Sequence, residues 1–441
     1  MTELAALLRL SIPIAIAQLG LVAMSLVDTA AIGRVSVDDL AGAGIGRSIG
    51  FGTVVVGIGV AAGLEPLAAQ AVAAGEPGRA WQGFVTNLRA TMLLWPLSMA
   101  AAFAVTLALP AVGLDAAVIS RVRLYLLGQA PGFAATLAFF SAKTFLQTHG
   151  RTTPALVGSV VANVVNLPVS NLLVRGDGAL LAIGMRARGL PALGALGGGI
   201  AFSVACFVLL AFVGVPALEY RARGDAPAVP LSTAYRLGLP AGLQMFAEVG
   251  VFSVVALLSG ALGPEVASAH HIAIGLASFT FMAALGVSGA TSVRVAYAIG
   301  AGTSPRRAGV VGIALGAAAM TFGAVVFLAM PHALMRVFTT DERVIAVGAT
   351  LLRIAAVFQV FDGVQAVATG ALRGAGDVRF PFVANVFAHW VVGFPAAMVL
   401  GFTLHHGARG LWWGLTAGLV FVSALLAGRF WILTRSAIAR V

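Results

Sequence analysis

The stretch "LPAGLQMFAEVGVFSVVALL", from Leu239 to Leu258, is a run of residues that are almost all apolar or small. About 20 such residues form a helix long enough to cross the hydrocarbon core of a bilayer. The stretch holds a single ionisable side chain, Glu248, and the nearest basic residue along the chain is Arg236. It therefore predicts a membrane-spanning helix with a carboxylate near the middle of the membrane.

The whole chain has the same character. Of its 441 residues, 60% are hydrophobic and only 10% are charged, whereas soluble proteins carry about 25% charged residues. The apolar runs are too long for the short alternating strands of a membrane β-barrel. We therefore predict an all-α polytopic membrane protein with twelve transmembrane helices in two pseudo-symmetric six-helix bundles. The spans are expected at about 5–30, 45–74, 91–112, 122–146, 154–174, 193–218, 233–260, 269–298, 308–330, 344–371, 381–404 and 411–434.

The basic residues give the expected orientation. The formal net charge is +11, but the arginines lie singly or in pairs at the ends of apolar segments. This is typical of loops between spans and not of a nucleic-acid surface. An even number of spans puts both termini on one side, which has 16 Lys/Arg against 11 on the other. We expect a multi-pass protein of the plasma membrane (a bacterial inner membrane) with both termini cytoplasmic and a retained first helix.

The two halves of the chain resemble each other at an offset of 227 residues. "RLSIP" at 9–13 matches "RLGLP" at 236–240, and Pro154 and Pro168 match Pro381 and Pro395. Six spans per copy preserve direction, so the pattern predicts a parallel repeat. The predicted division is an N-lobe at 1–218, a cytoplasmic linker at 219–231 and a C-lobe at 232–441. A cleft between two such lobes is typical of transporters that work by alternating access.

Four acids fall inside predicted spans: Asp28, Glu65, Glu248 and Asp362. A charge at the bilayer centre costs at least ~2.5–3.5 kcal/mol, so such residues usually mark an ion or substrate path. Each acid can exchange protons or coordinate a cation such as Na⁺. For any one of them, a protonated carboxyl that packs against a neighbouring helix is the alternative.

Three other features of the spans have simpler interpretations. We expect Lys143 to extend its ammonium group towards the cytoplasmic interface, and His270 and His271 to lie at the outer membrane interface. Pro13 interrupts the first span and is either a mobile hinge or a static kink. Catalytic motifs and a Walker loop are absent from the sequence, so we expect neither an enzyme nor ATP-driven transport.

Several motifs together resemble the multidrug and toxic compound extrusion (MATE) transporters, and in particular their NorM-like branch. These are "SIPIAIAQLGLVAMSLVDTAAIGRVSVDDLAGAGIG" from Ser11, "LGLPAGLQMFAEVGVF" from Leu237 and "LRGAGDVRFP" from Leu372. The resemblance implies a secondary active antiporter that exports organic cationic drugs or dyes in exchange for inward Na⁺ or H⁺.

The resemblance also implies roles for residues. Glu248 and Asp362 match the acids of the second-lobe cation site, where Na⁺ is a possible ligand, and Asp28 matches the coupling aspartate of the first lobe. Four further residues are possible members of the cleft: Glu65, Gln244, Gln365 and Tyr297. For Glu65, simple packing is the alternative.

The expected partners are the organic cations and the bilayer, with no nucleic acid, no ATP and no cofactor besides the coupling ion. We expect a monomer. The alternative function is that of a lipid-linked precursor flippase of the wider superfamily, which the acidic character of the expected cleft disfavours.

Overall fold

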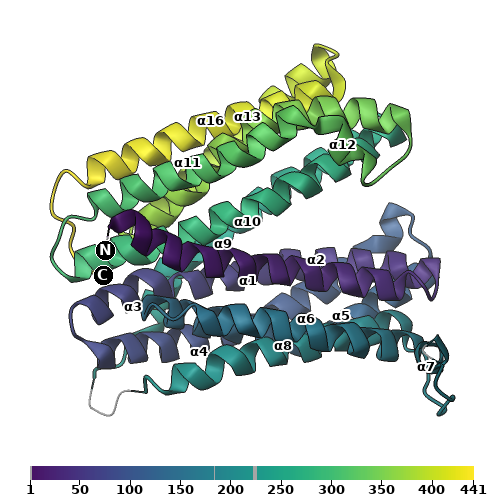
Figure 1. The fold of residues 1–441 in the computed structure, drawn as a ribbon, viewed down its shortest axis with the longest axis horizontal. Helices are drawn as coiled ribbons and strands as arrows, with labels where there is room; N and C mark the ends of the chain where they lie inside the picture. Colours follow the sequence, from purple (N-terminus) through teal and green to yellow (C-terminus); the bar gives the residue numbers. More distant parts are fainter. Residues whose placement is uncertain (1, 183, 222–225) are drawn as a thin grey trace. The chain divides into compact units, whose positions relative to one another are not determined.

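The computed structural model describes residues 2–182, 184–221 and 226–441, which are almost entirely helical and contain no β-strand (Figure 1). Twelve stretches of this described chain are long and apolar enough to cross a membrane. The prediction of an all-helical protein with twelve spans is therefore confirmed, and six of the twelve spans are longer at both ends than predicted. The spanning helices outside the second and eleventh spans are α1 (Glu3–Ile32), α4 (Pro77–Ala108), α5 (Ala116–Thr148), α6 (Thr153–Arg175), α8 (Gly194–Leu218), α9 (Leu231–Ala261), α10 (Pro264–Gly300), α11 (Arg306–Ala329), α13 (Glu342–Gly374) and α16 (Gly407–Leu433).

The second and the eleventh spans are each built from several pieces. The second span consists of α2 (Val37–Ala62) and α3 (Leu64–Ala73), which meet at Gly63. The eleventh span contains two π-helical stretches, where the backbone hydrogen bonds are those of a wider turn. Its pieces are α14 (Arg379–Val386), η2 (Phe387–Gly393), α15 (Phe394–Met398) and η3 (Val399–Thr403). Three short helices complete the described chain: η1 (Leu109–Val112), α7 (Asp177–Ala182) and α12 (Pro331–Arg336).

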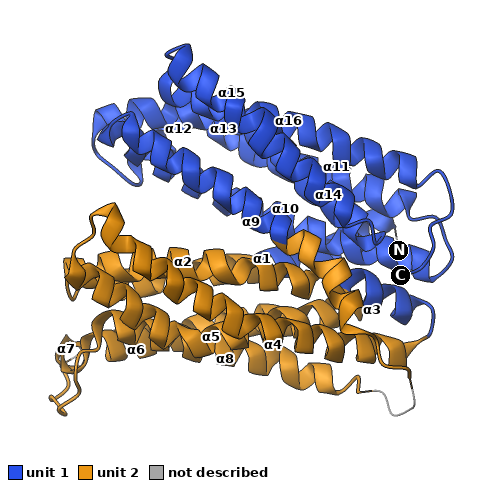
Figure 2. Ribbon diagram, turned by 180° about the vertical axis from the view of Figure 1, so that it is seen from behind, with its two compact units in different colours: residues 1–16, 65–75, 243–441 blue, residues 17–64, 76–242 orange. Residues whose placement is uncertain are grey.

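The helices form two compact units (Figure 2). Unit 1 comprises residues 1–16, 65–75 and 243–441, and unit 2 comprises residues 17–64 and 76–242. Both α1 and α9 therefore change unit part-way along their length, after Ile16 and after Gly242. The lobe boundaries predicted at 218 and 232 stay a prediction, and residues 222–225 of the predicted linker 219–231 lie outside the described residues.

In unit 2, α5 packs closely on α8 because small residues line their contact. A Cβ added at Gly128 would lie 2.6 Å from the carbonyl oxygen of Leu196, and one added at Gly199 would lie 2.9 Å from the amide nitrogen of Gln129. Both distances are below van der Waals contact. Glycine at these positions lets two helix backbones approach each other, as is common in membrane bundles.

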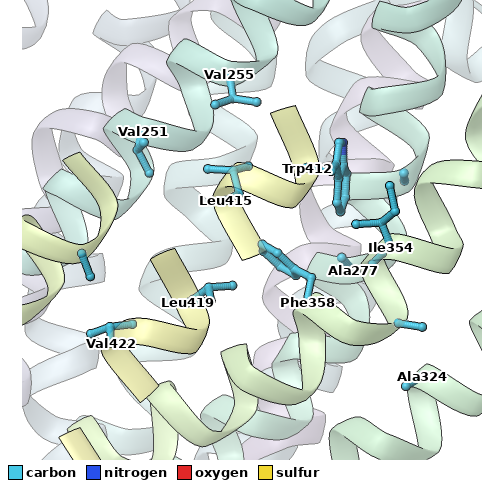
Figure 3. Close-up of a cluster of buried hydrophobic side chains, with 14 of the residues drawn as sticks. Val251, Val255, Ala277, Ala324, Ile354, Phe358, Trp412, Leu415, Leu419 and Val422 are labelled. Carbon is cyan, nitrogen blue, oxygen red and sulfur yellow. The ribbon is translucent and has the colours of Figure 1, made fainter. Parts of the chain in front are cut away.

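The core of unit 1 is formed by α9, α10, α11, α13 and α16, and Figure 3 shows part of it. Phe358 from α13 packs against Trp412 from α16, with ring centroids 5.6 Å apart. The indole Nε1 of Trp412 donates to Nδ1 of His270, which is only 2% exposed. His270 therefore fills a buried position beside this aromatic core, and its expected place at the depth of the outer membrane interface stays a prediction. The neighbouring His271 is exposed.

Candidate functional site

Unit 1 brings together Glu248 from α9 and Asp362 from α13. Both side chains are half-buried, and they lie close enough for their charges to interact. Within the described part of the chain, Asp362 forms no hydrogen bond or ion pair, and neither acid has a basic partner. Two carboxylates at such close range repel each other when both are ionised. A proton or a cation bound at either acid relieves this repulsion.

Amide side chains hold Glu248 in place. The Nε2 groups of Gln244 and Gln365 donate to its Oε1 at 3.0 and 2.9 Å. Gln244 and Gln365 are 5% and 3% exposed, so buried amide groups fix the position of this carboxylate oxygen. The Oε2 atom accepts no hydrogen bond from the described residues, which leaves it available to a ligand.

The eleventh span adds two polar residues that the sequence analysis missed. Asn385 Oδ1 accepts from Gln365 Nε2 at 2.7 Å, and the Nδ1–H of His389 donates to the carbonyl oxygen of Asn385 at 2.9 Å. His389 lies in the π-helical stretch η2, a geometry that often occurs at functional sites. The available signal was an amide and an imidazole four residues apart in an apolar span, but the sequence analysis followed only the acids.

Unit 2 contains Asp28, which is 1% exposed. Its Oδ1 accepts from Asn166 Nδ2 at 2.8 Å, and Ser170 lies beside it on the same helix, α6. Asp28 Oδ2, Asn166 Oδ1 and Ser170 Oγ are all buried without a hydrogen-bond partner among the described residues. Buried oxygen atoms of this kind are rare in native proteins and call for a proton, a water molecule or an ion.

Glu65 differs from the other three acids because it is paired. Its Oε2 lies 2.8 Å from Nε of Arg373, and the side chains are 6% and 15% exposed. Five residues further along α3, Gln70 donates to the carbonyl oxygen of Gly374 at 3.2 Å. These contacts attach α3 to the end of α13 within unit 1, so Glu65 has a structural explanation.

Tyr297 and Pro13 lie on other parts of unit 1. Tyr297 packs against Ala69 of α3 and lies beside Arg294, away from the hydrogen bonds around Glu248. Pro13 lies inside α1, about one turn before the helix changes unit after Ile16. Its position suits a hinge, which stays a prediction.

Lys143 is buried by neighbouring side chains, and its position relative to the cytoplasmic interface stays a prediction. The side chain is 6% exposed, and its Nζ donates to Gln18 Oε1 at 3.0 Å. The ammonium group also lies 4.8 Å from the ring centroid of Phe140, a distance that suits a cation–π interaction. These local contacts replace the water that an interfacial lysine would have.

The acids are thus arranged in two separate groups of different composition. Within the described residues, no group of three or more His, Cys, Asp or Glu side chains could hold a metal ion in the manner of a resident metal centre. What both groups offer is oxygen ligands for a transient monovalent cation or for a proton.

Comparison with known proteins decides the family. A model of the MatE family matches residues 13–172 and again residues 240–399. The two matches begin 227 residues apart, which confirms the predicted repeat. Together they cover most of the chain. The chain belongs to the MatE family.

Named relatives and a solved structure agree with this membership. The chain is 36% identical to the probable multidrug resistance protein NorM of Deinococcus radiodurans, over 98% of this chain and 96% of the relative. It is 34% identical to the multidrug resistance protein NorM of Burkholderia vietnamiensis, over 98% and 94%. The crystal structure of the eukaryotic MATE transporter AtDTX14 shares its fold, with a TM-score of 0.86, 21% identity and coverage of 98% and 96%. This MatE protein is therefore a multi-pass multidrug efflux transporter and not an enzyme.

The MatE repeat relates the backbones of the two halves but not their acids. The positions that correspond to Asp28, Glu248 and Asp362 in the other half are occupied by Val255, Leu21 and Ala135. Each half therefore has its own polar group, with its own set of acids.

Proposed function

We propose that this protein is a secondary active antiporter that exports organic cations in exchange for Na⁺ or H⁺ moving inward. The observation that carries the proposal is the pair Glu248 and Asp362. They are two half-buried, interacting carboxylates with no basic partner among the described residues. In the low dielectric of a membrane such a pair attracts positive charge strongly. It can be neutralised by an organic cation, by a metal cation or by protons.

Exchange follows because these ligands compete. With both acids ionised, the site holds an organic cation through its negative charge. When Na⁺ or H⁺ binds the carboxylates, that attraction weakens and the organic cation is released. A ligand that binds one state of the site more tightly shifts the protein towards that state, so competition of this kind couples the two fluxes.

Asp28 supports a second coupling step in unit 2. It is buried, with one carboxylate oxygen unpartnered and further unpartnered oxygens on Asn166 and Ser170. We propose that it takes up a coupling ion separately from the pair in unit 1. Exchange of one monovalent drug for one monovalent ion moves no net charge. Exchange for two ions moves one charge, which adds about 2.3 kcal/mol of driving force per 100 mV.

The two repeats and the basic residues support the remaining parts of the proposal. Parallel repeats related by an axis along the membrane normal are typical of carriers that work by alternating access. We propose that Pro13, one turn before α1 changes unit, is a hinge for this motion. One chain contains both repeats, so we expect a monomer to complete the cycle. The excess of arginine on the terminal side favours cytoplasmic termini in a bacterial inner membrane.

Efflux of a fluorescent organic cation from everted membrane vesicles tests the proposal. A Na⁺ gradient at constant pH and a pH gradient without Na⁺ are imposed separately. We expect at least one gradient to drive efflux, and Glu248→Gln or Asp362→Asn to abolish or strongly reduce it. Glu265→Gln is the matched control, because Glu265 is an acid of the same unit whose partner Arg343 is exposed. Normal gradient-driven efflux in both acid variants would refute the proposal.

A further inference from the structure

Arg47 lies in unit 2 on α2, inside a membrane span and half-buried. Its Nη1 donates to the carbonyl oxygen of Ser25 at 2.9 Å and to Thr29 Oγ1 at 2.8 Å. Its Nε donates to the phenol oxygen of Tyr125 at 3.4 Å. Ser25 and Thr29 flank Asp28 in sequence, so the guanidinium group lies against the turn of α1 that carries the acid.

Arg47 and Asp28 interact electrostatically without forming an ion pair. Asp28 instead receives its short hydrogen bond from Asn166. The titratable and polar groups that face Asp28 from the surrounding helices are Arg47 on α2, Tyr125 on α5, Asn166 and Ser170 on α6, and Cys206 on α8. Arg47 is the positively charged member of this described set.

The two acid groups consequently differ in net charge. In unit 1, Glu248 and Asp362 together carry two negative charges when ionised, and no described basic residue contacts them. In unit 2, the charge of Asp28 is already balanced by the nearby guanidinium group. Arginine stays protonated at all relevant pH values, so the positive charge beside Asp28 is permanent.

We propose that Arg47 is a specificity-determining residue of the Asp28 site, because it makes that site accept a proton and exclude a metal cation. The inference rests on the proposed role of Asp28 as a coupling acid. A hard metal cation needs a shell of several oxygen ligands. Arg47 already donates to three oxygens beside Asp28, those of Ser25, Thr29 and Tyr125. This leaves Asp28 Oδ2, Asn166 Oδ1 and Ser170 Oγ as the unpartnered oxygens around the acid among the described residues, which is fewer than such a shell requires.

A proton has no such requirement. It forms a single O–H bond with one carboxylate oxygen, and Asp28 Oδ2 has no hydrogen-bond partner that would block it. Both ions add one positive charge beside Arg47, so the supply of free ligands decides between them. The protein then separates its two ions: unit 2 responds to protons, and a metal cation, where one is used, binds at the acid pair of unit 1.

Binding of ²²Na⁺ to purified protein tests this assignment. The variant Glu248→Gln/Asp362→Asn removes the acids of unit 1, so that the remaining Na⁺ binding reports on Asp28. We expect no specific Na⁺ binding in this variant. Adding Arg47→Gln should create Na⁺ binding that disappears again with Asp28→Asn. The matched control is Arg123→Gln in the same background, since Arg123 bonds to Thr106 on another part of unit 2; it should create no Na⁺ binding.

Two results would overturn the proposal. One is Na⁺ binding that depends on Asp28 while Arg47 is present. The other is the absence of Na⁺ binding in a folded protein in which Arg47 has been replaced by glutamine. A second measurement does not depend on that variant folding. In the Glu248→Gln/Asp362→Asn protein, proton uptake by Asp28 should be unchanged by excess Na⁺, and displacement of the proton by Na⁺ would contradict the assignment. Failure of the proposed coupling role of Asp28 would appear separately, as normal pH-driven efflux in the otherwise unchanged protein carrying Asp28→Asn.

Discussion

Glu65 and Arg373, 308 positions apart in the chain, form a buried ion pair of 2.8 Å within unit 1. Glu248, in the same unit, has only amide donors around it. Both acids lie in apolar helices, but one charge is compensated inside the protein and the other is left for a ligand. This difference separates an acid that holds helices together from one that, as we propose, takes part in transport.

Breaking the pair should therefore destabilise the protein. Glu65→Gln leaves Arg373 buried and uncompensated, which typically costs about 3–5 kcal/mol. We expect a lower unfolding temperature in detergent, largely restored in the double variant Glu65→Gln/Arg373→Gln. Glu342→Gln is the control, since the ion pair of Glu342 with Arg336 is exposed and should matter little. A stable Glu65→Gln protein that has lost ion-coupled efflux would instead place Glu65 in the transport site.

Gln365 should increase the affinity of the Glu248 site for an organic cation through its hydrogen bonds, although it carries no charge itself. Its Nε2 donates to both Glu248 and Asn385. Replacing it by leucine removes two hydrogen bonds, and we expect the affinity for a fluorescent organic cation to fall about tenfold, the equivalent of ~1.4 kcal/mol. Gln359→Leu on the same helix is the control, because Gln359 bonds to Thr280. Equal losses in the two variants, measured by equilibrium binding, would show a general packing effect.

The fold could be predicted because it depends on hydropathy along the chain. Helices of twenty or more apolar residues satisfy their own backbone hydrogen bonds, and lipid permits few alternatives. Contacts between distant spans could not be predicted in this way. The sequence shows Glu65 and Glu248 as equivalent intramembrane acids, and the pairing of Glu65 with Arg373 appears only in the folded unit. The same limit explains why the buried contacts of Lys143 with Gln18 and of His270 with Trp412 were not predicted.

The candidate site could be predicted in part. Glu248, Asp362, Gln244 and Gln365 were identified as candidates, and they come together in unit 1. Asn385 and Arg47 were not identified. A lone polar residue in a span is ambiguous until its neighbours on other helices are known.

Asp177 should make the loop after α6 sensitive to acid. Its carboxylate accepts from the backbone N–H groups of Arg188, Gly189 and Leu190 at 2.9, 2.9 and 3.1 Å. These hydrogen bonds lower the pKa of Asp177 below its usual value of 3.8. The stabilisation is therefore present above pH 3.8 and is lost as the pH falls through the lowered folded-state pKa.

Hydrogen exchange of residues 184–193 measures this effect. At neutral pH the amides of Asp177→Asn should exchange faster than those of the wild type. The ratio of the two rates should approach one as the pH falls below the folded-state pKa of Asp177. A ratio that does not depend on pH would contradict the role assigned to the carboxylate.

Equilibrium binding of a monovalent fluorescent organic cation to the purified protein, titrated with Na⁺ at fixed pH and with pH in the absence of Na⁺, tests the central claim most directly. We predict that the apparent Kd rises with the concentration of at least one of the two ions. This dependence should disappear in Glu248→Gln/Asp362→Asn. An apparent Kd that is unaffected by both ions in the wild type, or an undiminished ion dependence in the double variant, would contradict competition at these two acids.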